Sequence, residues 1–374
     1  MKLTPFKLER FFAKHEFSAP YLLCSSDCES MTVGELLAFE PDARDQFESL
    51  WLGYTESLGH PELRRLIADL YEASSPEQVL VHAGAEEAIF NFMNVVLSPG
   101  DHVIVHAPYY QSLGEIARSI GAEVSEWLGN PEEAWALDLD VLKSMISDRT
   151  KVVVINVPHN PTGFLPTSAF AQELAALSEQ HGFIIFADEV YRGLEIDVQD
   201  RLPSFTDLNA RAVSLGVMSK TYGLPGLRIG WLTTQDKKLF DELASFKDYT
   251  TICNSAPSEF LAMLALRNGP KIIDRNLQII RTNLDLLDAF FASHEDNFRW
   301  DRPKAGSIAF PLLLKGNVDT FCADLVAQAG VLLLPGTLYG DAFSAFRVGF
   351  GRKNLPDALE RLAHFLETQP INEF

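Results

Sequence analysis

The sequence predicts an α/β protein built on a mainly parallel β-sheet with helices on both faces. Short β-branched runs, typical of buried strands, occur between helical stretches such as 86–97 and 168–180. Glycine or proline ends several of these stretches. Strands that alternate with helices favour parallel pairing, because each helix crosses back over the sheet. The runs expected as strands are 79–82, 102–106, 151–157, 183–187, 212–217 and 228–233.

The chain changes character after about residue 258. A long helical stretch runs to about residue 293, extended segments follow at 307–314 and 331–334, and an amphipathic helix is expected at 355–367. We therefore expect a large domain from residue 45 to 265 that holds the sheet. A smaller α/β domain would combine 1–44 with 266–374. The amphipathic N-terminal stretch is expected to form a surface helix of the fold.

Composition limits the classes of partner. The chain has 374 residues, with 51 acidic against 31 basic side chains and a formal charge of −20. Nucleic acids and anionic membranes need clustered cations, so neither is an expected partner. No apolar stretch has the length of a transmembrane helix, and we expect a cytoplasmic protein. Cys24 and Cys28 have the spacing of a metal pair, but no matching Cys/His pair accompanies them, so buried thiols and no metal are expected.

Polar residues and glycines follow five of the expected strands. Each group has a plausible structural role alone, as a tight turn, a helix cap or a surface lysine. In open parallel sheets, however, ligands bind beyond the carboxyl ends of the strands. Five such groups in succession therefore predict one ligand site at this edge. The groups are GAE at 84–86, PYY at 108–110, HNPTG at 159–163, DEVY at 188–191 and SK at 219–220.

A family resemblance joins these groups. The stretches GAEEAI, NVPHNPTG, ADEVY and MSKTYGLPGLRIGW occur in this order, and LLPGTLYG and FRVGFG follow near the C-terminus. This arrangement resembles the class I/II aminotransferases, which are fold-type-I enzymes dependent on pyridoxal 5'-phosphate (PLP). The resemblance extends from about Tyr54 to Arg347. It implies a seven-stranded sheet in the large domain and PLP as the cofactor.

The resemblance also assigns the residues around the cofactor ring. Lys220 would carry PLP as a Schiff base and later act as the general acid/base, which requires a lowered amine pKa. Asp188 would pair with the ring nitrogen and keep it protonated. Asn160 and Tyr191 would hydrogen-bond the phenolic oxygen, with Tyr191 counted among the catalytic residues. Tyr110 would stack on the ring.

The phosphate would bind at the N-terminus of the helix that begins near Gly84, Ala85 and Glu86, where backbone N–H groups are free. Ser219 and Arg228 would complete its binding site. Tyr54 matches a tyrosine that reaches the phosphate across a dimer interface, which implies a homodimer with shared active sites. Many relatives carry hydroxyl residues at the positions of Ala83 and Val217, so two phosphate donors are missing here.

Arg347 is expected to bind the substrate carboxylate together with Asn160, because a guanidinium pairs bidentately with a carboxylate. The predicted reaction is transamination between an L-amino acid and a 2-oxo acid. β- or γ-elimination, or cyclisation of a hydroxylated arginine-like substrate, remains the alternative. A non-catalytic effector-binding domain, as in some transcription regulators of this fold, is not expected. Those proteins carry a DNA-binding module ahead of the fold, and this chain is strongly acidic. A Rossmann dehydrogenase lacks its G-x-G-x-x-G sequence.

The segment 23–30 and Arg267 bear on the substrate side chain. Asp27 and Glu29 could face a cationic side chain, but we expect solvated loop acids. Arg267 falls in a helical pattern and is expected on the surface, so it is not assigned to a dicarboxylate substrate.

Overall fold

The computed structural model describes residues 2–340 and 343–369 and confirms the α/β class. Its central sheet has seven strands in the order β2-β8-β7-β6-β5-β3-β4. β8 is antiparallel to both of its neighbours, and the other pairs are parallel. The strands are β2 (Val79–His82), β3 (His102–Ala107), β4 (Glu123–Leu128), β5 (Thr150–Asn156), β6 (Ile184–Asp188), β7 (Val213–Val217) and β8 (Gly230–Thr234).

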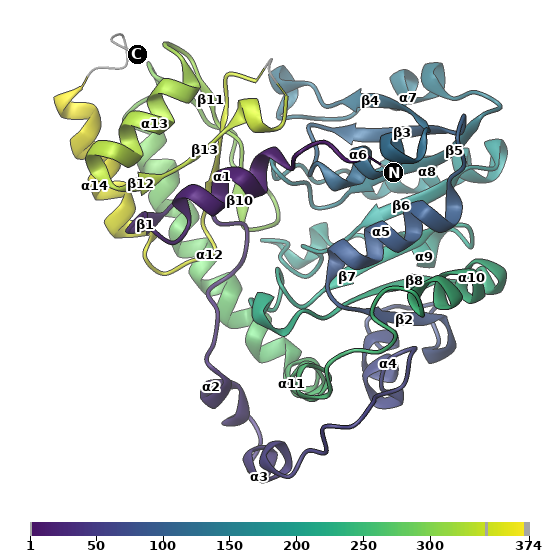
Figure 1. Cartoon of the computed structure of the whole chain (residues 1–374). Coiled ribbons are helices and arrows are strands. Elements are labelled where there is room, and N and C mark those ends of the chain that lie inside the picture. The colour runs from purple at the N-terminus through teal and green to yellow at the C-terminus, as the bar shows by residue number, and fades with distance from the viewer. Residues whose placement is uncertain (1, 341–342, 370–374) are drawn as a thin grey trace.

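Helices cover both faces of this sheet (Figure 1), and the side chains of its strands pack alternately on the two layers. Val152 and Val154 of β5 pack with α5 (Ala85–Val96), α6 (Ser112–Ile120) and α10 (Lys237–Lys247). Val153 and Ile155 point to the opposite face and pack with α7 (Leu139–Met145), α8 (Ser168–His181) and α9 (Phe205–Leu208). Successive residues of a strand face opposite sides, so a run that is apolar throughout requires cover on both.

Two expectations about elements were wrong. β4 was not predicted, because this edge strand reads Glu-Val-Ser-Glu-Trp-Leu and only Trp127 is fully buried. The stretch 258–293 is not one helix but two, α11 (Ala256–Arg267) and α12 (Gly269–Ala292), which meet at Asn268. Pro270 follows Gly269 in the first turn of α12. Proline lacks the N–H that a helix interior needs and therefore favours a helix start.

The smaller lobe is built from both ends of the chain. β1 (Tyr21–Leu22) pairs in parallel with β12 (Val331–Leu332), so the N-terminal segment joins the C-terminal third. A second small sheet has the order β10-β14-β13, from Ile308–Ala309, Phe346–Gly349 and Leu334–Pro335. β11 (Leu312–Leu313) pairs with β9 (Phe298–Arg299), and α13 (Val318–Ala329) and α14 (Leu355–Thr368) complete the lobe. We keep the domain division at residues 45 and 265 as a proposal.

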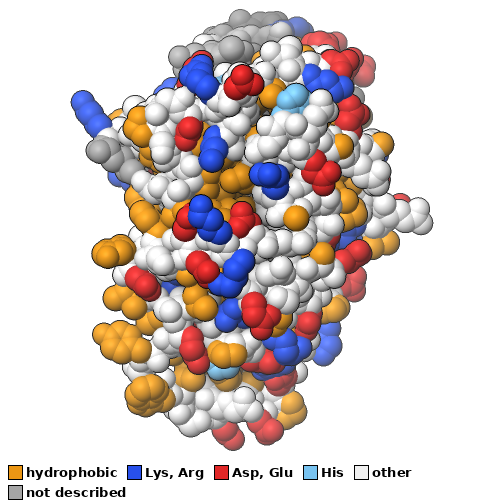
Figure 2. Space-filling model, turned by 90° about the vertical axis from the view of Figure 1, so that its right-hand side faces the viewer, with side chains coloured by type: hydrophobic (Ala, Val, Ile, Leu, Met, Phe, Trp, Pro, Cys, Tyr) orange, Lys and Arg blue, Asp and Glu red, His pale blue; other side chains and the backbone are white. Residues whose placement is uncertain are grey.

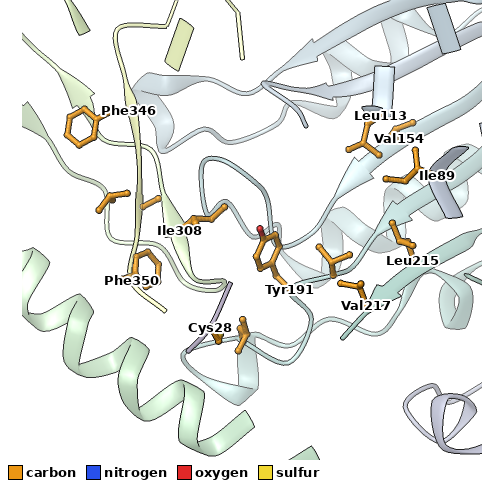
Figure 3. Packing of buried hydrophobic residues seen from close by; sticks show 14 of the residues in the cluster. Cys28, Ile89, Leu113, Val154, Tyr191, Leu215, Val217, Ile308, Phe346 and Phe350 are labelled. Atoms are coloured by element: carbon orange, nitrogen blue, oxygen red, sulfur yellow. The ribbon is translucent and has the colours of Figure 1, made fainter. Parts of the chain in front are cut away.

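Three short helices lie at the opposite end of the molecule, below the sheet in Figure 1. They are α2 (Val33–Leu37), α3 (Ala43–Glu48) and α4 (Pro61–Ala68), and their apolar side chains share a core with α11. The main core is continuous between the lobes, with Leu215 of the sheet and Phe346 of the smaller lobe in one cluster (Figure 3). In residues 2–340 and 343–369, no helix has both the length and the apolar character to cross a membrane.

Candidate active site

A cavity of about 460 Å³ lies at the carboxyl ends of the parallel strands, between the sheet and the smaller lobe. Helix α1 (Lys7–His15) covers it, and in Figure 1 this helix crosses the space between the lobes. Most of the predicted site residues come together here. Those that line the cavity are Ala85, Glu86, Tyr110, Asn160, Asp188, Tyr191, Ser219, Lys220, Arg228 and Arg347.

Lys220 follows β7 and extends its amine into the cavity. Its Nζ donates a hydrogen bond to Ser26 Oγ at 2.8 Å and lies 6.0 Å from the centre of the Tyr191 ring. Burial lowers the pKa of the Lys220 amine, and the Asp27 carboxylate opposes this shift. A lowered amine pKa raises the fraction of neutral amine near pH 7, which is the form that attacks a carbonyl or accepts a proton.

Asp188 ends β6, level with Asn156 of β5 in the parallel register. It is only 6% exposed, and one carboxylate oxygen accepts a hydrogen bond from the Val190 N–H at 3.3 Å. Burial raises the pKa of the Asp188 carboxyl to about 7. No cation forms an ion pair with it in the described part of the chain. A protonated ring nitrogen is a group that would satisfy this carboxylate.

Tyr191 and Asn160 offer polar groups to a ligand. Tyr191 is 1% exposed, and in the described chain its hydroxyl has no hydrogen-bond partner. Figure 3 shows the Tyr191 ring between Ile308 on one side and Val217 on the other, with its hydroxyl directed away from Val217. Asn160 Oδ1 accepts from Tyr339 at 3.1 Å and from Arg347 at 3.2 Å, which leaves its amide nitrogen to donate. A buried donor without a partner is costly, so the Tyr191 hydroxyl indicates a missing acceptor.

The phosphate end of the cavity is formed by close backbone contacts. Gly84 has a φ of 91° and precedes α5, whose first N–H groups are free to bind an anion. A Cβ on Gly84 would lie 2.6 Å from the Arg228 guanidinium, and one on Gly230 would lie 2.7 Å from the Gly84 carbonyl carbon. Arg228 itself has a φ of 52°, an uncommon conformation for a side-chain residue. This packing places a guanidinium beside a helix N-terminus, as phosphate binding requires.

Near this end of the cavity, Ala83 and Val217 stand where the family resemblance implies hydroxyl side chains. Val217 lines the cavity and is 3% exposed, so an apolar side chain stands where many relatives have a hydroxyl. Ala83 donates its backbone N–H to Glu87 Oε2. Glu86 also lines the cavity, and burial raises the pKa of its carboxyl to about 7. Protonation would allow Glu86 to lie near a phosphate without like-charge repulsion.

Arg347 lies in β14 and is 2% exposed. Its Nε and Nη2 donate to the Cys24 carbonyl oxygen at 3.0 and 2.8 Å, and its Nη1 donates to Tyr339 Oη at 2.8 Å and to Asn160. All four hydrogen bonds go to uncharged oxygens. A buried guanidinium without a carboxylate is suited to bind one from a substrate.

Several residues of the cavity were not predicted. Glu9, Phe12 and Glu16 come from the N-terminal region, which was expected only at the surface. The expectation of a solvated Asp27 was wrong, because this residue is 9% exposed and pairs with Arg352 at 2.9 Å. No local pattern indicates these contacts, although Glu9 and Glu16 are seven residues apart and therefore share one side of a helical path. Further cavity residues that were not predicted include Ser25, Ser26 and Asn156, and Tyr339 was also missed although it binds Arg347.

Two predicted site residues, Gly84 and Tyr54, lie outside the cavity, and so does Arg267, which was expected at the surface. Gly84 is beside it, in contact with Arg228. Tyr54 is 86% exposed, so within one chain it contacts no cavity. Arg267 forms an ion pair with Glu40 at 2.9 Å near the surface, as expected for a residue without a site role.

The family model for aminotransferase class I and II matches residues 21–364. This chain belongs to the class I and II aminotransferase family. Its cofactor is PLP, and the cavity fits that cofactor, with an orphaned tyrosine hydroxyl, a buried carboxylate and an anion-binding helix end. The family, the fold class and the cofactor expected from the sequence are therefore confirmed.

Relatives within this PLP-dependent family differ in the reaction that their names describe. Capreomycidine synthase of Streptomyces vinaceus is 32% identical, over 96% of this chain and 93% of the relative. A PLP-dependent aminotransferase from Streptococcus suis superposes with a TM-score of 0.93 at 33% identity, covering 98% of this chain and 99% of the other. The PLP-dependent cyclase OrfR has a TM-score of 0.89 at 30% identity, with 98% of both chains covered.

Replacing Arg347 by alanine is expected to raise KM for the amino acid about 100-fold and to lower kcat much less. Two charge-assisted hydrogen bonds to a carboxylate contribute about 3 kcal/mol, and this contact forms before any bond is broken. Steady-state kinetics would measure the effect. An unchanged KM would contradict the assignment. Arg347→Lys is the matched control for charge, and it should recover little because ammonium lacks the planar fork.

Proposed function

We propose that this chain is a transaminase that transfers the amino group of an L-amino acid to a 2-oxo acid. The observation that carries this proposal is that Lys220 and Arg347 line the same cavity. The lysine amine has a lowered pKa, and the buried guanidinium has no carboxylate partner within residues 2–340 and 343–369. An amino acid held by its carboxylate at Arg347 presents its α-carbon near Lys220.

The residues of the cavity would divide the work as follows. Lys220 would hold the cofactor through its aldehyde and would provide the amine that accepts the α-proton at Nζ. PLP, when bound, would supply the electron sink for the pair that this proton leaves behind. Asp188 would hold the ring nitrogen, while Tyr191 and Asn160 would donate to the ring oxygen. Arg347 orients the α-carboxylate, and Phe12 of α1 helps to keep water out.

Cyclisation or elimination is the second candidate, and the likeness to capreomycidine synthase and to the cyclase OrfR favours it. Both candidates share the loss of the α-proton, so the residues around Lys220 serve either reaction. They differ in which bond forms or breaks next. Transamination would release a 2-oxo acid by hydrolysis and leave the amino group on the cofactor, whereas loss of a side-chain group would give an eliminated or cyclised product.

A single-turnover screen tests this proposal. The PLP-loaded protein is mixed with individual L-amino acids, the absorbance of the cofactor is followed, and products are identified by mass spectrometry. A 2-oxo acid formed together with pyridoxamine phosphate supports transamination. An eliminated or cyclised product would replace the first candidate by the second. A protein that changes neither cofactor nor amino acid would contradict both.

We also propose that the active protein is a homodimer. Apolar side chains are exposed in two loops, at Trp51, Leu52 and Tyr54 and at Tyr249 and Ile252. Hydrogen bonds join these loops, because Thr55 donates to the Asn254 carbonyl at 2.9 Å and Lys247 donates to the carbonyls of Ser57 and Ile252. On the face in Figure 2, exposed apolar side chains gather mainly along one edge. A contiguous exposed apolar patch is typical of a subunit interface.

This patch also lies near the phosphate end of the cavity. Glu87 accepts a hydrogen bond from the Ala83 N–H and others from the Thr250 and Thr251 hydroxyls, so it links the start of α5 to the loop at 249–252. A second subunit docked on the patch could therefore place its Tyr54 at the phosphate.

The cytoplasmic location also stays a prediction.

Combining Tyr54→Ala with Lys220→Ala in one dimer should restore native PLP affinity at one site if Tyr54 acts in the partner's site. Tyr54→Ala is expected to bind PLP about 10-fold more weakly through loss of one charge-assisted hydrogen bond. Tyr54→Ala and Lys220→Ala would be unfolded together, refolded as hybrids and compared with each variant refolded alone. A hybrid then has one site with both native residues, and its affinity for PLP at that site should return to the native value. Absence of this recovery in verified hybrids would place Tyr54 outside the partner's site.

A further inference from the structure

Three carboxylates line one wall of the cavity. Glu9 and Glu16 come from α1 and its C-terminal end, and Asp27 comes from the segment that follows β1. Glu9 accepts a hydrogen bond from the uncharged Tyr110 hydroxyl at 3.0 Å. Within residues 2–340 and 343–369, the Glu16 carboxylate forms no hydrogen bond or ion pair. Only Asp27 has a cationic partner, Arg352.

This wall is short of positive charge. Burial raises the pKa of the Glu16 carboxyl, and the nearby Glu9 and Asp27 carboxylates raise it further, although Arg352 opposes them. Three acids against one guanidinium leave an excess of negative charge in a partly buried place. Such an excess is costly unless a cation is bound there.

Another part of the cavity lining has the reverse imbalance. Arg347 is buried with only neutral acceptors, and Lys220 lines the same cavity. The Asp27 and Glu9 carboxylates raise the pKa of the Lys220 amine, and Arg347 lowers it. Within residues 2–340 and 343–369, a ligand in this cavity therefore meets a guanidinium without a carboxylate partner and, at Glu9 and Glu16, carboxylates without a cationic partner. The unpartnered Tyr191 hydroxyl, 1% exposed in the same cavity, indicates that the cavity binds a ligand, and the proposed function assigns this hydroxyl to the cofactor.

We propose that the amino-acid substrate carries a positive charge at the end of its side chain, and that Glu9, Glu16 and Asp27 bind this charge. The inference rests on the proposed function, since it takes Arg347 as the site of the α-carboxylate. A guanidinium or ammonium group then reaches the acidic wall while the α-carbon stays near Lys220. Carboxylates confer selectivity because they attract the cation and repel an acidic side chain.

Arg352 suggests the opposite substrate class, an amino acid with a second carboxylate. Its guanidinium is already occupied, however, because Nε and Nη2 both donate to Asp27 at 2.9 to 3.2 Å. A substrate carboxylate would have to displace Asp27 and would then lie among Glu9 and Glu16. The charges in the cavity therefore favour the cationic side chain.

Paired amino acids of matched shape provide the test. L-Arginine and L-citrulline have equal length and differ in one charged nitrogen, and L-lysine and L-norleucine form a second pair. Each is mixed with the PLP-loaded protein in a stopped-flow instrument. The dissociation constant is taken from the first absorbance change, before product accumulates. We expect arginine to bind at least about 10-fold more tightly than citrulline, with L-glutamate weakest.

Variants assign this preference to the wall. Glu9→Gln and Glu16→Gln should each weaken arginine binding about 10-fold and leave citrulline binding nearly unchanged, because only a charge is removed. Glu179→Gln, on the exposed face of α8, is the matched control and should change neither constant. Circular dichroism verifies that each variant is folded.

Equal binding of arginine and citrulline, and of lysine and norleucine, would overturn this inference. Tighter binding of glutamate would overturn it in favour of a dicarboxylate substrate. Either result would leave the proposed function standing, because the amino acids would still react with the cofactor. Failure of every amino acid to change the cofactor absorbance would contradict the proposed function itself. The comparison in the native protein decides the inference even if a variant does not fold.

Discussion

Lys220→Ala is expected to reduce turnover by about 10³-fold or more while the protein still binds PLP. In the proposed mechanism the lysine serves twice, as the covalent attachment and as the base at the α-carbon, and general base catalysis alone contributes about 10² to 10⁴-fold. Affinity for PLP should persist, because Asp188, Arg228 and the N-terminus of α5 remain. Single-turnover kinetics and the absorbance of the retained cofactor would measure both effects.

The control for this variant is Lys238→Ala. Lys238 lies in α10 with a side chain that is 86% exposed, so its removal should leave turnover unchanged. If Lys220→Ala turned over at the native rate, Lys220 would not be the base. Complete loss of PLP binding would instead mean that the remaining contacts of the cavity are too weak to hold the cofactor alone.

Asp188→Asn is expected to lower turnover by about 10² to 10³-fold, because removal of one partner from a buried charge pair costs about 3–5 kcal/mol. The amide has nearly the shape of the carboxylate and can still accept from the Val190 N–H, so the cavity should keep its form. Asp188→Glu restores the charge and should recover part of the rate. Native turnover in Asp188→Asn would show that no charge is needed at this position.

The same substitution should raise the stability of the cofactor-free protein at neutral pH, although it lowers turnover. Burial raises the pKa of the Asp188 carboxyl from 3.8 to about 7. The folded state therefore binds a proton that the unfolded state releases, and this group's stabilisation is lost as the pH rises from about 4 to about 7. The loss amounts to about 4 kcal/mol at about 1.4 kcal/mol per unit. Asp188→Asn should abolish this loss.

Urea unfolding of the cofactor-free protein at pH 5 and pH 8 would measure the effect. The native protein should lose more stability between these values than Asp188→Asn does. An equal pH dependence of the unfolding free energy in the two proteins would show that burial does not raise the pKa of the Asp188 carboxyl. Greater stability together with lower activity in the variant would show that Asp188 serves the cofactor and lowers the stability of the cofactor-free protein.

The sequence predicted the sheet and the side of the cavity that belongs to it. A ligand site at the carboxyl ends of parallel strands follows from topology, so Asp188 and Lys220 could be expected together once their strands were recognised. Register then places Asn156 beside Asp188. Strand β4 escaped prediction because it is an edge strand that carries two exposed acidic residues, Glu123 and Glu126.

The other side of the cavity could not be predicted in this way. Glu9 contacts Tyr110 and Asp27 contacts Arg352 across 101 and 325 residues of chain. Such contacts depend on how the N-terminal segment passes between the lobes, and no local pattern encodes that path. Asp27 in particular has the local surroundings of a solvated loop acid, and only the approach of β14 and the loop after it buries this residue. In the account proposed above, substrate selectivity is carried by residues whose position cannot be read from the local sequence.

Borohydride reduction of the PLP-loaded protein, followed by proteolysis and mass spectrometry, tests the assignment of Lys220 most directly. Reduction converts the linkage between PLP and its lysine into a stable amine that survives digestion. A pyridoxyl group is expected on Lys220 in the native protein and on no peptide of Lys220→Ala. A pyridoxyl group on another lysine, or none in a protein that had bound PLP, would contradict the account.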